Sequence, residues 1–194
     1  MSHLPWPKEN EQSPLGKEMI EKFQKKYGRP THIFPPMSWN DRFISAASDA
    51  WHRLVVEPSK FPRWIKEAVV VITCSTQGTE YCVQGHSHAL RLESKLTASQ
   101  VKAIQTHTFE GFSDPELSIF RFAHKAAGQP KSMTREDYEK LQRLGLTNEM
   151  ILEILGVIWV NTAMNFIVDA LGVKRTPEEV EELDRSLERE LARM

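Results

Sequence analysis

The segment GTEYCVQGH, at residues 78–86, places a cysteine and a histidine four residues apart, directly after a glycine. On a helix, Cys82 and His86 would share a face, about 40° apart at 3.6 residues per turn. A thiol beside an imidazole can be an activated nucleophile, half of a metal site, or two ordinary core residues. Buried cysteine usually behaves as a small hydrophobe, so the spacing alone favours the core interpretation.

Cys82 would lie in the first turn of a helix predicted for residues 79–94. Backbone N–H groups and the positive end of the helix dipole stabilise a thiolate in such a place. One turn later, His86 could accept the thiol proton or remain an imidazolium beside the sulfur. The position therefore permits a reactive cysteine.

Glu67 interrupts the apolar stretch of the preceding helix, predicted for residues 62–76. A short turn would fold this helix back antiparallel, which brings Glu67 near the cysteine or the histidine of the motif. Buried glutamate is rare unless it is paired. The alternative is a glutamate at the exposed start of the helix, paired with Arg63 or Lys66.

A metal site is the less favoured interpretation of the same residues. The two cysteines, Cys74 and Cys82, form no CxxC pair and cannot supply four ligands. Cys82, His86 and Glu67 with a water would match a three-ligand catalytic zinc site, which is a minor alternative. His88 points about 200° away from His86 on a helix, so we expect it at the surface or at an interface.

Two further groups of residues have weaker signals. Cys74 lies eight residues before Cys82, on the other arm of the predicted hairpin. We expect Cys74 in the core rather than as a partner thiol of Cys82, although a contact between the two thiols is an alternative. The helix predicted for residues 148–171 turns polar at one end, which either lines a pocket or reaches solvent. The polar residues of that end are Thr162, Asn165 and Asp169.

Helical periodicity runs through nearly the whole chain. The stretch EAVVVITC is rich in β-branched residues and could be a buried strand, but its continuity with PRWIK favours a helix. The expected fold is all-α, a compact bundle of about eight helices with the motif on a helical hairpin. Helices are predicted at residues 16–27 (ending at Gly28, before Pro30), 38–56, 62–76, 79–94, 148–171 and 176–193. Capping residues predict further helices after Thr97, Ser113 and Thr134.

The length of 194 residues suits a single domain spanning residues 1–194. Residues 1–15 are expected as an N-terminal arm, because they carry three prolines and many polar residues. Residues 176–193 form a strongly charged last helix. That helix either makes a subunit contact through one narrow apolar stripe or is a solvated terminal helix.

Composition excludes several classes of partner. The 25 basic and 26 acidic residues give a net charge of -1 without a basic cluster, so neither nucleic acid nor an anionic membrane is expected. The N-terminus has no signal-peptide pattern, and the longest apolar stretches fall short of the about 18 residues that span a bilayer. Two cysteines are too few for a disulfide scaffold. A soluble cytoplasmic protein is expected.

Taken together, these residues resemble the alkylhydroperoxidase D-like / carboxymuconolactone decarboxylase superfamily, and most of all its peroxidase-related branch. The motif there is a glutamate, eleven residues, then CxxCxxxH. Here Glu67 is followed by eleven residues and then TEYCVQGH. Cys82 matches the second cysteine and His86 the histidine, whereas Thr79 stands in place of the first cysteine. The resemblance spans residues 40–173 and includes SHALRL, LSIFRFAHKAAGQP, LQRLGLTNEMILEILGVIWV and NFIVDALGV.

The resemblance implies an all-helical homo-oligomer, often a trimer or hexamer, with no cofactor and no metal. Members with both cysteines are thiol-dependent peroxidases, in which the glutamate and histidine relay a proton to or from the reactive thiol. Other members decarboxylate a muconolactone and do not need the thiol pair. The implied partner is thus a small molecule, either a hydroperoxide or a small carbon acid.

Thr79 departs from the family at a decisive place, because it cannot form a disulfide. Three interpretations remain. In the favoured one, Cys82 attacks a peroxide and an external thiol, or Cys74 after rearrangement, resolves the sulfenic acid. His86 is then the activating base, and Glu67 orients it. Thr79 is expected to hydrogen-bond the sulfur, with Tyr81 and Asn165 as supporting residues of the site. The others are acid–base chemistry by Glu67 and His86, and a binding pocket without catalysis.

Overall fold

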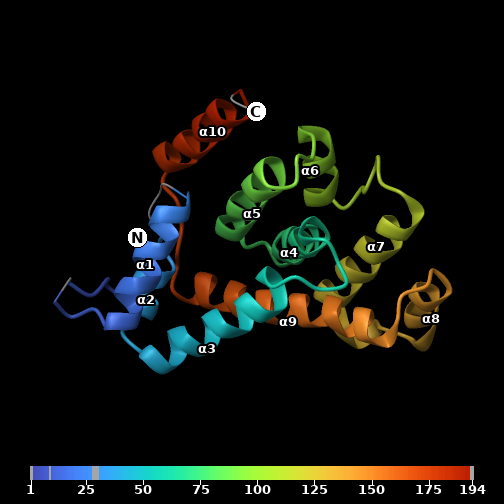
Figure 1. The fold of residues 1–194 in the computed structure, drawn as a ribbon, viewed down its shortest axis with the longest axis horizontal. Helices are drawn as coiled ribbons and strands as arrows, with labels where there is room; N and C mark the ends of the chain where they lie inside the picture. Colours follow the sequence, from blue (N-terminus) through green and yellow to red (C-terminus); the bar gives the residue numbers. More distant parts are fainter. Residues whose placement is uncertain (1, 9, 28–30, 193–194) are drawn as a thin grey trace.

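The computed structural model describes residues 2–8, 10–27 and 31–192, and every regular element in this part of the chain is a helix (Figure 1). The all-α prediction is confirmed. Ten α-helices are described rather than about eight, together with a π-helical turn at His52–Val56 and a 3-10 turn at Pro130–Ser132. The α-helices are α1 (Pro14–Tyr27), α2 (Phe34–Met37), α3 (Asp41–Trp51), α4 (Arg63–Gln77), α5 (Glu80–Leu92), α6 (Ala98–Gln105), α7 (Asp114–Gly128), α8 (Arg135–Arg143), α9 (Asn148–Ala170) and α10 (Pro177–Leu191).

Helix α4 is the centre of the molecule. Figure 1 shows it nearly end-on, with α5, α6, α7 and α9 around it, and it contacts each of them. Every side chain from Ile65 to Cys74 is buried. A helix that is apolar on all sides needs such an environment, which explains the β-branched run. The prediction that EAVVVITC is helical is therefore confirmed.

The turn between α4 and α5 forms the predicted hairpin. Gly78 ends α4 in the left-handed conformation, with φ of 79°, which glycine adopts without steric cost. The backbone N–H of Thr79 donates to the carbonyl of Cys74 at 3.0 Å, and the N–H of Cys82 donates to the carbonyl of Thr79 at 3.1 Å. This tight turn places the first turn of α5 directly beside the last turn of α4.

Helix α9 packs along the bundle against α3, α4 and α7. By length and composition alone it could cross a bilayer, but here it is a core helix with two buried asparagines, Asn161 and Asn165. Its outer face exposes Leu152, Trp159 and Phe166, each seven residues from the next. The homo-oligomer expected from the resemblance stays a prediction.

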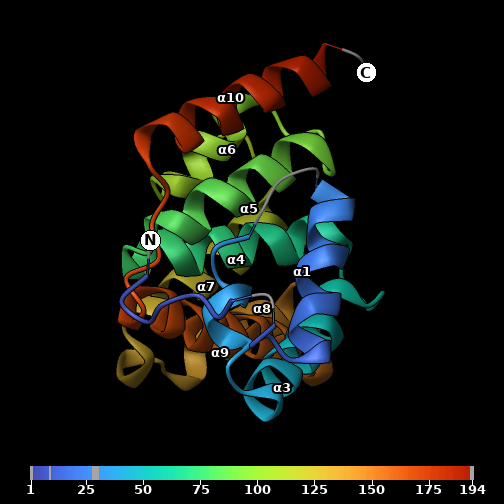
Figure 2. The ribbon, with the colours of Figure 1, turned by 90° about the vertical axis from the view of Figure 1, so that its left-hand side faces the viewer.

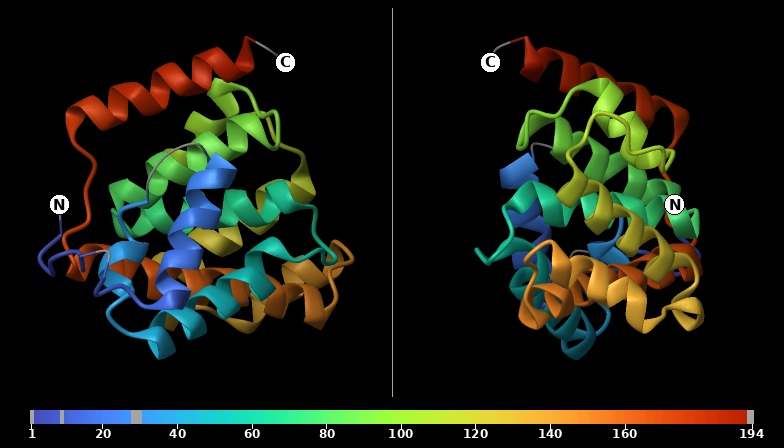
Figure 3. Two further views of the ribbon diagram at one scale, coloured as in Figure 1. Left: turned by 60° about the vertical axis from the view of Figure 1, so that its left-hand side comes forward. Right: turned by 90° about the vertical axis from the view of Figure 1, so that its right-hand side faces the viewer.

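Helix α10 lies outside the bundle, along α5, after an extended connection from α9 (Figures 2 and 3). Leu183 is its buried residue. The apolar stripe of α10 thus packs on α5 of the same chain. At the other terminus, the N–H of His3 donates to the carbonyl of Leu171 at 2.6 Å, and the indole of Trp39 donates to the carbonyl of Pro5 at 2.8 Å.

Several predicted boundaries were wrong near the N-terminus. Helix α1 begins at Pro14, inside the expected arm, because the Ser13 hydroxyl accepts from the N–H of Gly16 at 2.9 Å and caps it. The cap of α3 is Asn40, whose side chain accepts from Phe43, and not Ser38. Ser38 donates instead to the carbonyl of Pro35 at 2.7 Å.

The proline-rich connector contains the short helix α2, which the sequence analysis did not predict. Its residues Pro35, Pro36 and Met37 are buried, so this segment packs against the rest of the protein instead of forming an exposed loop. The predicted end of the first helix at Gly28, before Pro30, lies outside the described residues.

Truncating one buried and one exposed phenylalanine should separate the core from the surface. Phe120 is fully buried, whereas Phe166 is 69% exposed. We expect Phe120→Ala to lower the free energy of unfolding by about 3–5 kcal/mol. The matched variant Phe166→Ala should change it by less than about 0.5 kcal/mol. Urea unfolding measures both, and equal losses would contradict the core assignment.

Candidate functional site

Glu67 lies at the middle of the candidate site and is held by two cationic partners. It is 1% exposed. His86 Nδ1 lies 2.9 Å from Glu67 Oε2, which joins α5 to α4. Arg63, one turn earlier on α4, donates to the other carboxylate oxygen through Nε at 3.0 Å and also through its terminal nitrogen. The interpretation of Glu67 as an exposed glutamate at the start of the helix is wrong, although its pairing with Arg63 is present.

The pairing decides the charge of both groups. Burial raises the pKa of Glu67, but His86 and Arg63 outweigh it, so the pKa is lower than usual. Burial lowers the pKa of His86, but the Glu67 carboxylate outweighs it, so that pKa is raised. An imidazolium hydrogen-bonded to a carboxylate is the expected state near neutral pH. His86 Nδ1 is then the donor.

Cys82 and His86 occupy one face of α5, as the spacing predicts. Cys82 is 7% exposed, in the first turn of the helix. The ring of Trp51, from α3, lies 5.2 Å from the imidazole of His86, centroid to centroid. The thiol, the imidazole and Glu67 are thus gathered on the α4–α5 hairpin under an aromatic cover.

Cys74 is the residue whose surroundings differ most from the expectation of a simple core cysteine. It is fully buried, yet Asn161 Nδ2 donates to its sulfur at 3.1 Å and the thiol donates to Asn165 Oδ1 at 3.6 Å. Burial raises the pKa of Cys74 well above its usual range, Cys82 raises it further, and the charge of His86 lowers it. Asn165, named from the sequence as a supporting residue, therefore contacts Cys74 rather than Cys82.

Arg175 is a site residue that the sequence analysis missed. It follows α9 by several residues, and its guanidinium lies 3.9 Å above the ring of Tyr81. It donates to the carbonyl of Tyr81 at 2.6 Å and to Gln84 at 3.1 Å. Burial lowers the pKa of Arg175, whereas Tyr81 and Cys82 act to raise it. No local pattern signals this contact, because Arg175 and Tyr81 lie 94 positions apart in the sequence.

Thr79 does not have the role expected of it. Its hydroxyl donates to Asp169 Oδ2 at 2.7 Å, so its proton is not directed at a sulfur. Gln77, at the end of α4, donates a hydrogen bond to the Thr162 hydroxyl at 2.9 Å and accepts one from Asn165 at 2.8 Å. The polar end of α9 therefore hydrogen-bonds to the α4–α5 turn. Neither a pocket lining nor an exposed end, the two alternatives from the sequence, describes this arrangement.

His88 is a correction. It is 9% exposed and counts among the buried residues of α5, so the expected surface position is wrong. The contact between α5 and α6, where Gln105 donates to Ser87 at 2.8 Å, covers this part of α5. Among the described residues, no three His, Cys, Asp or Glu side chains form a group suited to a metal ion. The minor zinc alternative therefore gains no support.

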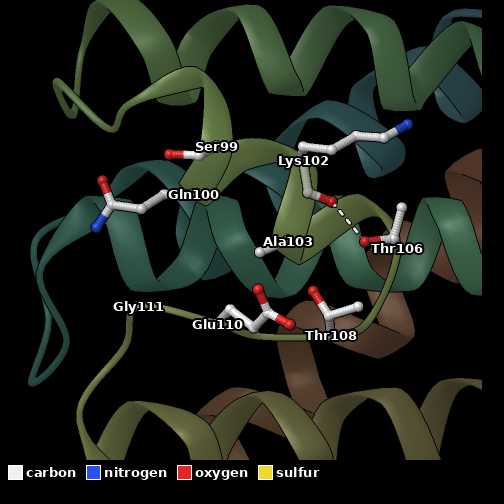
Figure 4. A pocket seen from close by; sticks show the side chains of 8 residues that line it. All are labelled: Ser99, Gln100, Lys102, Ala103, Thr106, Thr108, Glu110 and Gly111. Carbon is white, nitrogen blue, oxygen red and sulfur yellow. Dashed lines mark hydrogen bonds between the residues drawn. The ribbon is translucent and has the colours of Figure 1, made fainter.

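A surface hollow lies away from these residues. It holds about 410 Å³ between α6 and the segment leading to α7, and Figure 4 shows mostly polar side chains around it. Its lining includes Ser99, Lys102 and Glu110, and none of the candidate residues. It is open and unconnected with the thiol chemistry.

Comparisons with known proteins identify the fold. No family model matches the sequence, and no curated protein matches it. Among solved structures, an alkylhydroperoxidase AhpD core, an uncharacterized peroxidase-related protein from Ralstonia eutropha JMP134, has a TM-score of 0.84 at 19% identity, over 92% of this chain and 94% of that one. An uncharacterized peroxidase-related protein from Silicibacter sp. TM1040 has a TM-score of 0.82 at 18% identity, over 92% of each chain.

A third similar structure carries other chemistry. It is the debrominase Bmp8, in a variant with alanine in place of a cysteine, in complex with 2,3,4-tribromopyrrole. Its TM-score is 0.78 at 16% identity, over 96% of this chain and 98% of that one. At these identities the likeness shows the fold alone, and the fold expected from the resemblance, that of alkylhydroperoxidase D, is confirmed.

Replacing Glu67 by glutamine should lower the pKa of His86. The amide keeps the shape of the side chain but removes the charge that raises this pKa, and burial then dominates. NMR titration of the histidine ring protons measures the change. Glu57→Gln, beside the exposed His52, is the matched control and should leave His86 unaffected. An unchanged His86 in the Glu67 variant would contradict the pairing.

The same pairing fixes how stability changes with pH. Because the folded pKa of His86 is raised, its contribution is complete below the unfolded value of about 6.5 and is lost as pH rises through the folded pKa. The difference in free energy of unfolding between the wild type and His86→Gln should therefore shrink from about pH 6 toward alkaline pH. Urea unfolding across this range tests it, and a difference that grows with pH would refute it.

Proposed function

We propose that this chain, which has the alkylhydroperoxidase D fold, is a thiol-dependent peroxidase that reduces a hydroperoxide at Cys82. The observation that carries the proposal is the pairing of the buried Glu67 with His86, one helical turn from Cys82. Arg175 adds a positive charge at the first turn of α5. A thiol at a helix N-terminus among cationic groups is suited to react as a thiolate.

The proposed step uses these residues in separate roles. The Cys82 thiolate attacks the terminal oxygen of the hydroperoxide, an S–O bond forms, and the O–O bond breaks. The imidazolium of His86 gives its proton to the leaving alkoxide, which departs as an alcohol. Glu67 holds the ring through Nδ1 and keeps it protonated beforehand. Cys82 is left as a sulfenic acid, which a thiol reductant returns to the thiol.

The burial of Cys82, at 7% exposed, favours a small hydroperoxide over a large one. Trp51 packs on the ring of His86, and Arg175 packs on the ring of Tyr81, the residue before Cys82. The reductant is proposed to be a soluble thiol or dithiol.

Removal of bromine from a small aromatic ring is a second candidate function. The likeness to the debrominase Bmp8, whose complex with a bromopyrrole was obtained with a cysteine replaced by alanine, favours it. The same cysteine, Cys82, would carry this chemistry. Release of bromide from 2,3,4-tribromopyrrole in the presence of a thiol, with no turnover of hydroperoxide, would favour this candidate over the first.

Replacement of Cys82 by serine should abolish hydroperoxide reduction. With hydrogen peroxide and dithiothreitol, we expect Cys82→Ser to fall to the uncatalysed rate. His86→Gln, which cannot supply a proton, should slow turnover by about 10²–10⁴-fold. The rate of peroxide loss measures both effects.

His52→Gln is the matched control, because His52 is exposed and lies outside the site. Its rate should equal that of the wild type. Hydroperoxide turnover that survives in Cys82→Ser would refute the proposal. Turnover of a small carbon acid by that variant would instead assign acid–base chemistry to Glu67 and His86.

A further inference from the structure

Cys74 and Cys82 face each other across the turn of the α4–α5 hairpin. Cys74 is in the last turn of α4 and Cys82 in the first turn of α5. The carbonyl of Cys74 accepts the N–H of Thr79, and the carbonyl of Thr79 accepts the N–H of Cys82. Both cysteines are free, and the Cys82 side chain acts on the pKa of the Cys74 thiol, as expected of two close sulfurs. The two thiols are therefore neighbours although eight positions separate them.

Cys74 has polar contacts, which a purely structural buried cysteine does not need. Asn161 donates to its sulfur at 3.1 Å, and Asn165 accepts from its thiol at 3.6 Å. Asn161 is fully buried, and its Oδ1 has no hydrogen-bond partner among the described residues. Its amide also donates to the carbonyl of Val70 at 3.4 Å. A buried polar atom without a partner destabilises the fold, so the contact with the thiol suggests a role for Asn161 beyond packing. An amide N–H at a sulfur stabilises negative charge on it.

We propose that Cys74 is the resolving thiol of this chain: it attacks the oxidised sulfur of Cys82 and closes a Cys74–Cys82 disulfide. This inference rests on the proposed reduction of a hydroperoxide at Cys82. It assigns to α4 the thiol that the family motif would place at residue 79, where this chain has Thr79. It also replaces an external thiol as the group that attacks the sulfenic acid.

Closing the disulfide releases the oxygen of the sulfenic acid as water. After the hydroperoxide is reduced, Cys82 is a sulfenic acid and His86 a neutral imidazole. His86 takes the proton of the Cys74 thiol, and the Cys74 sulfur attacks the Cys82 sulfur. An S–S bond forms, the S–O bond breaks, and the leaving hydroxide takes the proton from His86 as water. An external dithiol then reduces the disulfide by exchange and is itself oxidised to a disulfide.

The protonation of Cys74 suits the thiol that resolves the sulfenic acid rather than the thiol that attacks the hydroperoxide. Burial raises the pKa of the Cys74 thiol well above its usual range, and Cys82 raises it further. Cys74 therefore waits as a thiol while Cys82 reacts. The charge of His86 lowers the pKa of Cys74, so the two groups are close enough for the proposed proton transfer once the imidazole is neutral.

The experiment follows one equivalent of hydrogen peroxide, without reductant, in the wild type and in Cys74→Ser. Dimedone is present to trap sulfenic acid, and peptide mapping under non-reducing conditions locates a disulfide. The wild type should consume the peroxide, lose the mass of two hydrogen atoms and contain a Cys74–Cys82 disulfide. Cys74→Ser should consume one equivalent and carry the dimedone adduct on Cys82.

The outcomes separate this inference from the proposed function. Peroxide consumed by a wild type that carries as much dimedone adduct as Cys74→Ser would overturn the resolving role and leave the peroxidase proposal intact. Peroxide consumed by neither protein would overturn the peroxidase proposal and the resolving role together. In that case diamide, which oxidises thiol pairs directly, shows whether the two cysteines still form a redox pair. No disulfide under diamide would overturn the pair whatever the peroxide does.

A rescue variant guards against a simple loss of structure in Cys74→Ser. The double variant Cys74→Ser, Thr79→Cys places the second thiol where the family motif has it. We expect it to lose the dimedone adduct again and to form a disulfide between residues 79 and 82. A disulfide in the double variant, together with no Cys74–Cys82 disulfide in the wild type, would overturn the resolving role of Cys74.

Discussion

A buried carboxylate is the constraint on which the rest of this structure depends. Glu67 lies on the central helix, almost without solvent contact, where an unpaired charge would be very costly. Arg63 and His86 balance it from two sides, and each partner fixes a different part of the fold. Arg63 sets the start of α4, and His86 holds α5 against it. Losing one partner of such a group typically costs about 3–5 kcal/mol, because the other charge stays buried.

The α4–α5 hairpin is therefore a unit, and the other helices serve it. Trp51 from α3 covers His86, while Asn161, Asn165 and Asp169 from α9 bind the end of α4 and the turn. Arg175, beyond α9, closes over the first turn of α5. The thiols are thus held by polar contacts from one side and by packing from the other. This preorganisation matters more to thiol chemistry than the mere presence of cysteine.

Much of the fold, but less of the site, could be predicted from the sequence. Spacing alone places Glu67, Cys82 and His86 on a hairpin, because Gly78 marks its turn and helical geometry does the rest. Capping residues such as Thr97 and Thr147 mark helix starts for the same local reason. The contacts of Cys74 with Asn161 and of Arg175 with Tyr81 depend instead on how distant helices pack. His88 was misplaced because its burial depends on packing around α5, which a helical wheel does not contain.

The order in which the chain is made gives the α9 contacts a further meaning. A ribosome releases α4 and α5 well before α9, so Cys74 and Cys82 emerge while the asparagines that enclose Cys74 do not yet exist. Until α9 and the segment around Arg175 arrive, Cys74 lacks its asparagine contacts and the first turn of α5 lacks the contact with Arg175. The nascent chain thus passes through a period in which Cys74 lacks the polar contacts that it has in the folded protein. The polar environment of this thiol is therefore among the last features that folding completes.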